Sequence, residues 1–118
     1  MKRFTYLFSL CLCIISLNAN SQSTGTGKYF LTIDTTMQNK VDSLMNIANS
    51  YYMLGQITIS IEYYNKALII NPNFAKAFFN RGNSYFDLGI NNKACEDWQK
   101  AKQLGHTEAD MSYWKFCE

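Results

Sequence analysis

The sequence has few of the residues that carry catalysis or strong charge. One of its 118 residues is histidine, His106, and 17% are charged. A lone histidine, which we expect to be a solvated turn residue, supplies neither a metal-ligand set nor a base for a nucleophile. No serine elbow motif and no glycine-rich phosphate loop occurs. These absences predict a chain that is not an enzyme, with no catalytic residues, no metal site and no cofactor.

The first residues have the pattern of an export signal. Residues 1–3 are Met-Lys-Arg, residues 4–17 are mostly apolar, and small side chains stand at −3 and −1 of a cleavage site between Ser21 and Gln22. A helix of fourteen residues rises only about 21 Å, less than the roughly 30 Å of a bilayer core. We therefore expect residues 1–21 to be a cleaved signal peptide rather than a membrane anchor.

Removal of this leader changes the charge and the cysteine count. It carries two basic residues and no acidic one, so nine basic residues remain against nine acidic ones. Without a basic stripe, binding to nucleic acid is not expected. Cys95 and Cys117 remain, in a compartment where disulfides persist. The sequence predicts a protein of the periplasm or cell surface, secreted and without a membrane span after cleavage.

Beyond the leader, the pattern predicts an all-α protein. Residues 22–35 are polar and contain glycine, so we expect a flexible linker in which 29–33 could lie as an extended apolar patch. The hydrophobic periodicity then predicts a helical domain over residues 36–118. The expected helices cover about 37–54, 57–70, 74–88 and 91–104, with a closing helix at about 107–117.

This domain contains an internal repeat. Between residues 41–72 and 75–106, a shift of 34 residues produces nine identities, in which residues 46, 49, 50, 51, 54, 55, 62, 66 and 67 fall on identical residues. Gly55 and Gly89 are placed to end the first helix of each pair, where a left-handed residue is favoured. Asn71-Pro72 separates the first repeat from the second.

The repeated residues resemble the tetratricopeptide repeat. The first set is Leu44, Ile47, Ala48, Tyr51, Leu54, Gly55, Ser60, Tyr64, Ala67 and Pro72, and the second is Phe78, Arg81, Gly82, Tyr85, Leu88, Gly89, Ala94, Trp98 and Ala101. The resemblance implies two helix-turn-helix repeats at about 41–74 and 75–106, capped by the closing helix. Such a chain is a fragment of a right-handed α-solenoid.

The spacing also indicates which side chains are buried. Leu44, Ile47, Tyr51 and Leu54 recur at steps of three and four residues, which predicts a buried stripe on the first helix. Small residues at equivalent positions of both repeats allow close helix packing, with the large Tyr64 or Trp98 between the layers.

The resemblance further implies a concave groove, lined by the first helix of each pair, that binds a peptide or protein partner. The groove positions carried over by alignment are Asp42, Met45, Asn46, Asn49, Tyr52, Met53, Lys76, Phe79, Asn80, Asn83, Phe86 and Asp87. Asn49 and Asn80 match two asparagines of the carboxylate clamp of some family members, but Met45 replaces the clamp lysine. The alternative is a structural module that assembles with itself as a homo-oligomer, or an accessory subunit of a cell-envelope complex.

The two remaining cysteines are predicted to form a disulfide. Cys95 lies ten residues before Gly105 and Cys117 twelve residues after it. If the helices on either side of this turn are antiparallel, the thiols return to about the same height. The alternative is two buried thiols that act as small hydrophobic groups.

Overall fold

The computed structural model describes the backbone of residues 23–117 and the side chains of residues 34–117. The chain divides between Thr36 and Met37 into two units, each described by itself below. The predicted signal peptide, residues 1–21, lies outside the described residues. Within residues 23–117 every regular element is a helix, which confirms the all-α prediction.

The segment predicted to be a flexible linker is helical as far as it is described. Helix α2 spans Ser23–Met53 and so begins well before the predicted residue 37. The apolar residues 29–33 are likewise helical rather than extended. Extending an existing helix costs no new nucleation, and the only proline of the sequence lies far downstream. Two glycines in the segment weaken helix formation, by about 1 kcal/mol each, without forbidding it.

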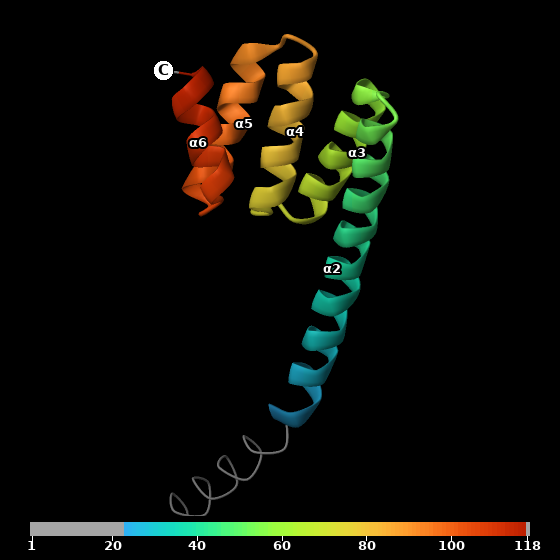
Figure 1. Ribbon diagram of the computed structural model, residues 1–118. Coiled ribbons are helices and arrows are strands. Elements are labelled where there is room, and N and C mark those ends of the chain that lie inside the picture. Colours follow the sequence, from blue (N-terminus) through green and yellow to red (C-terminus); the bar gives the residue numbers. More distant parts are fainter. Residues whose placement is uncertain (1–22, 118) are drawn as a thin grey trace, which may run out of the picture. The chain divides into compact units, whose positions relative to one another are not determined.

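The other helices agree with the predicted bounds within one residue at each end. They are α3 (Ile57–Ile70), α4 (Ala75–Asp87), α5 (Asn91–Gln103) and α6 (Thr107–Phe116). Helices α3 to α6 lie side by side in chain order, each against the next (Figure 1).

Glycine ends helices α2, α4 and α5 in the same way. Gly55, Gly89 and Gly105 have φ angles of 74°, 74° and 90°. At the end of α2, the backbone N–H of Gly55 donates to the carbonyl oxygen of Tyr52. The backbone N–H of Gln56 donates to the carbonyl oxygen of Tyr51. The left-handed residue thus satisfies carbonyl groups at the helix end, as the repeated glycines predicted.

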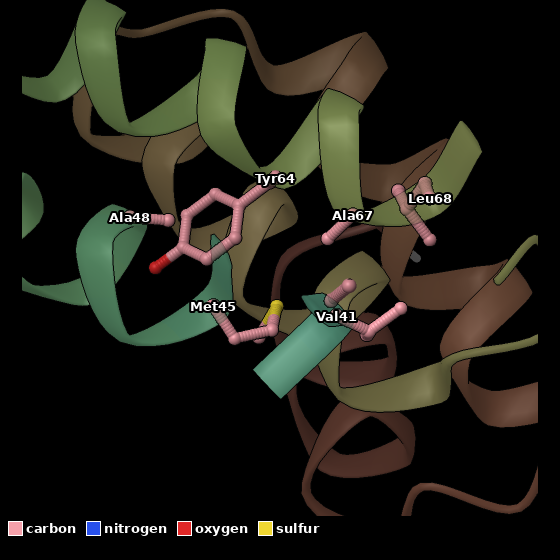
Figure 2. Close-up of a cluster of buried hydrophobic side chains, with 7 residues drawn as sticks. Val41, Met45, Ala48, Tyr64, Ala67 and Leu68 are labelled. Atoms are coloured by element: carbon pink, nitrogen blue, oxygen red, sulfur yellow. The ribbon is translucent and has the colours of Figure 1, made fainter. Parts of the chain in front are cut away.

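The core of the first repeat lies between α2 and α3, but on a different face of α2 from the predicted stripe. Val41, Met45 and Ala48 are buried with Tyr64 and with other α3 side chains (Figure 2). The prediction of a buried stripe through Leu44, Ile47, Tyr51 and Leu54 was wrong for two of its members. Ile47 is 38% exposed and Leu54 is 71% exposed. The helix presents apolar residues on two faces, and only one face meets α3.

The second repeat packs around Trp98, which is 2% exposed. A Cβ atom at Gly82 of α4 would lie only 2.7 Å from Cδ1 of Trp98, so this position has no room for a methyl group. The first repeat has Ala48 in place of Gly82 and the smaller Tyr64 in place of Trp98. The larger ring is therefore paired with the smaller residue, Trp98 with Gly82 and Tyr64 with Ala48.

A disulfide joins α5 to the end of α6. The Cα atoms of Cys95 and Cys117 are 5.7 Å apart, and the bond closes over 22 residues. Helix α6 is otherwise held by the buried Ala109 and by an ion pair of 2.7 Å between Lys102 Nζ and Asp110 Oδ1. Phe116 also packs against the rings of Phe86 and Trp98, with centroids 4.7 and 5.8 Å away.

Candidate functional site

The site begins with one hydrogen bond that occurs in both repeats. The hydroxyl of Tyr64 donates to Oδ1 of Asn49 over 2.6 Å, and the indole Nε1 of Trp98 donates to Oδ1 of Asn83 over 2.9 Å. In both cases an aromatic residue on the second helix of a pair holds an asparagine on the first helix. The two buried aromatic rings therefore fix the orientation of the two amide groups.

A third asparagine connects the repeats. Nδ2 of Asn80 on α4 donates to Oδ1 of Asn49 on α2 over 3.0 Å, so this oxygen accepts two hydrogen bonds. Within the described residues, the Nδ2 groups of Asn49 and Asn83 donate to no protein atom. Two N–H donor groups therefore stay available at this surface, while the matching oxygens are engaged.

These amides line a pocket of about 300 Å³ between the first helices of the two repeats. The pocket is lined by Asn49, Tyr52, Met53, Tyr64, Asn80 and Asn83. Its amide and phenol groups offer hydrogen bonds, and the Met53 side chain, 86% exposed, offers an adaptable apolar contact. Such a surface suits binding of a polar ligand with some apolar groups.

The two pocket tyrosines have raised pKa values for different reasons. The hydrogen bond that Tyr52 donates to Asp87 raises the pKa of Tyr52 from 10.0 to about 12. Burial is the main cause that raises the pKa of Tyr64 from 10.0 to about 12. Both phenols are therefore neutral donors at physiological pH, and both donate within the protein.

Comparisons with known proteins agree with this architecture. A family model described as TPR repeat matches residues 48–89. Among solved structures, the first TPR of Spaghetti (RPAP3), bound to the HSP90 peptide SRMEEVD, is similar. Its TM-score is 0.62 at 22% identity, over 85% of this chain and 86% of that one. Residues 48–89 thus carry a tetratricopeptide repeat, and the fold is that of a tetratricopeptide-repeat domain. No curated protein matches its sequence.

Five of the predicted groove residues of this tetratricopeptide-type fold meet in the pocket: Asn49, Tyr52, Met53, Asn80 and Asn83. Asn46 and Lys76 are exposed and do not line it. Asp42 is exposed on α2, and Asp87 accepts the hydrogen bond of Tyr52.

Three apolar groove predictions need correction. Met45 is 4% exposed and belongs to the core between α2 and α3, because it shares a helix face with Val41 and Ala48. Phe86 is partly buried against Trp98, with ring centroids 5.4 Å apart, so it packs the second repeat instead of lining the pocket. Phe79 does not line the pocket either, since its ring stacks on that of His106 with centroids 4.5 Å apart.

The same contact corrects the prediction for the histidine. The side chain of His106 is 16% exposed, and its Nδ1 lies 3.4 Å from Oε2 of Glu108. It covers Phe79 at the turn between α5 and α6 and is not a solvated turn residue. The 34-residue pattern gave no signal for it, since the first repeat has Asn71-Pro72 near the corresponding turn.

An ion pair between α4 and α5, which also has a hydrogen bond to α3, was not predicted from the sequence. Arg81 of α4 makes two hydrogen bonds of 2.7 Å to the carboxylate of Asp97 on α5, and its Nη1 donates to Oδ1 of Asn65 on α3 over 2.6 Å. Burial raises the pKa of the Asp97 carboxyl, and Arg81 counters that effect only in part. Because the first repeat has Ile47 and Tyr63 at the positions of this pair, the repeat gave no signal for it.

Other site classes are not indicated by the part of the chain that is described. Between residues 23 and 117 no group of histidine, cysteine and acidic residues is arranged to hold a metal ion. No helix in that range is long and apolar enough to cross a membrane.

Proposed function

We propose that this protein is an exported interaction module that binds a peptide segment of a partner protein in the asparagine-lined pocket. Tetratricopeptide-repeat proteins are generally interaction modules without catalytic activity, and the similar domain of Spaghetti is bound to a peptide. The observation that carries the proposal is the orientation of Asn49 and Asn83. Their oxygens are engaged inside the protein, and their Nδ2 groups remain free to bind a ligand.

This orientation selects the kind of ligand group that the pocket accepts. An unpaired amide N–H requires an acceptor, which a peptide supplies in each main-chain carbonyl. An extended segment exposes these carbonyls at regular intervals, whereas a helix uses them internally. The pocket therefore suits an extended segment, with an apolar side chain of the ligand placed against Met53.

The test removes the donor and keeps the acceptor. In Asn83→Asp a carboxylate oxygen still accepts the hydrogen bond of Trp98, but the N–H group is lost. A matched control, Asn92→Asp, adds the same charge at an exposed position of α5. We expect peptides selected from a random displayed library against the native chain to bind Asn83→Asp about tenfold more weakly or worse, and the control unchanged.

If both variants bind the selected peptides as well as the native chain does, the proposal that the asparagine-lined pocket binds the partner is refuted. A loss of binding accompanied by loss of the helical circular dichroism signal would show that Asn83 is needed for folding. In that case Asn49→Asp, which also keeps its acceptor, provides the second measurement. Crosslinking in native cell envelopes would then identify the partner.

The export part of the proposal rests on the leader pattern in residues 1–21. We expect the purified native protein to begin at Gln22. When a protease that cannot enter the cytoplasm is added to cells, we expect it to degrade the protein. An N-terminus at Met1 in the mature protein would refute cleavage.

A further inference from the structure

One row of residues along α2 lies at the surface, although its spacing is typical of residues that pack against another helix. The row is Ser43, Ile47, Ser50 and Leu54, spaced by four, three and four residues on one side of the helix. All four are exposed, Ile47 by 38% and Leu54 by 71%. Small and large side chains alternate along it.

The second repeat shows what such a row does. The equivalent residues of α4, 34 positions later, are Ala77, Arg81, Ser84 and Leu88. Ala77 and Ser84 are 0% exposed because α3 packs on them, and the Oγ atoms of Ser84 and Ser60 are 3.3 Å apart. Helix α3 and helix α4 are joined by a short turn and run antiparallel. The small members of this row, Ala77 and Ser84, are therefore contact positions for an antiparallel helix within this molecule, whereas Leu88 remains 43% exposed.

We propose that the row on α2 binds the same row of a second copy of this chain, with the two α2 helices antiparallel across a two-fold axis. Read in opposite directions, the alternation is complementary to itself. With the axis between positions 47 and 50, Ile47 faces Ser50 of the second copy, and Leu54 faces Ser43. Each large side chain then meets a small one, which allows close approach of the helices.

The polar groups at this surface are compatible with burial. The hydroxyl of Ser50 donates to the carbonyl oxygen of Asn46 over 2.9 Å, as the buried Ser84 does to Asn80 over 3.1 Å. Its donor is satisfied within its own helix, so docking does not strand it.

Charge favours the same arrangement. Lys40 is exposed one turn before Ser43. In the antiparallel pairing it lies just beyond the C-terminal end of α2 of the second copy, where the helix dipole favours a cation. Helix α2, as described up to Met53, has no basic residue in its own last turn. The second copy supplies one.

The experiment is sedimentation equilibrium of the chain produced with its own leader and purified without reductant. We expect a concentration-dependent equilibrium between monomer and dimer. Ile47→Lys brings two buried charges into each dimer and is expected to raise the dimer dissociation constant about a hundredfold or more. The matched control is Ile69→Lys on α3, because Ile69 is 81% exposed and lies outside the row. We expect it to leave the equilibrium unchanged.

A second variant, Ser50→Arg, fills the small position that receives Ile47 and decides the matter if Ile47→Lys fails to fold. A monomer at every concentration would overturn the proposal, even if Ile47 were found to bind a helix of another protein. A dimer that survives both row variants, or that Ile69→Lys disrupts equally, would also overturn it. Peptide binding in the asparagine pocket is measured separately, so the two proposals fail independently.

Discussion

The tight contact between Gly82 and Trp98 gives a sharp test of how the second repeat is packed. In Gly82→Ala the new Cβ atom would lie 2.7 Å from Cδ1 and 2.8 Å from Nε1 of Trp98, and 3.2 Å from the carbonyl oxygen of Ala94. The indole cannot move freely, because it is 2% exposed and its Nε1 donates to Asn83. Either α4 and α5 separate or the indole leaves its position.

The expected cost follows from three effects. Overpacking of a filled core costs about 1–3 kcal/mol. Weakening the hydrogen bond between Trp98 and Asn83 costs about 1 kcal/mol more. Alanine favours the helix over glycine by about 1 kcal/mol, which offsets the second effect. We therefore expect Gly82→Ala to lower the free energy of unfolding by about 1–3 kcal/mol. For a domain of this size, a loss near 2 kcal/mol lowers Tm by roughly 8–16 °C.

Urea denaturation followed by circular dichroism measures this loss. The first repeat suggests a second substitution that should restore part of the stability, because it combines Ala48 with Tyr64 where the second repeat combines Gly82 with Trp98. In a double-mutant cycle, Gly82→Ala should therefore cost less when Trp98→Tyr is also present. A Gly82→Ala protein as stable as the native one, or a cycle without coupling, would refute the packing argument.

Three further predictions concern the ties between helices. Cys117→Ser should lower the free energy of unfolding by about 3 kcal/mol under non-reducing conditions, since the bond closes over 22 residues, and a thiol assay of the native protein should find no reactive cysteine in the folded domain. Arg81→Ala should cost about 3–5 kcal/mol in urea denaturation by leaving the Asp97 charge buried and unpaired, and a loss below 1 kcal/mol would contradict this. The pKa of Tyr52 is raised to about 12, so its contact with Asp87 should stabilise the fold fully below about pH 10 and be lost as pH rises through 12. Carbon-13 NMR of the labelled phenol measures that titration, and a Tyr52 that titrates near 10 would exclude the contact.

The fold was largely predictable from the sequence because helix ends have local causes. Gly55 and Gly89 stop their helices through a backbone conformation that few other residues adopt, and the single proline separates the repeats. The three asparagines that line the pocket were among the groove positions that the resemblance to the tetratricopeptide repeat implied. Their amide orientation was not, because it depends on which atoms of Tyr64 and Trp98 reach them.

The errors arose where the neighbouring helix decides the outcome. Helix α2 has two apolar faces, and the periodicity cannot tell which of them a neighbour covers. Ile47 was therefore assigned to the core, and Met45, placed by the family alignment, to the groove. The ion pair between Arg81 and Asp97 joins residues on different helices, and the first repeat has no counterpart from which to predict it.

The bond between Cys95 and Cys117 determines how the array responds to force. A helical array without it can be unzipped from its last helix, one helix at a time, because each helix contacts only its neighbours. Tension applied at the C-terminus of this chain passes through the sulfur atoms into α5 and bypasses α6. The helix held by the fewest buried side chains is thus shielded from load, and mechanical unfolding starts further inside the array.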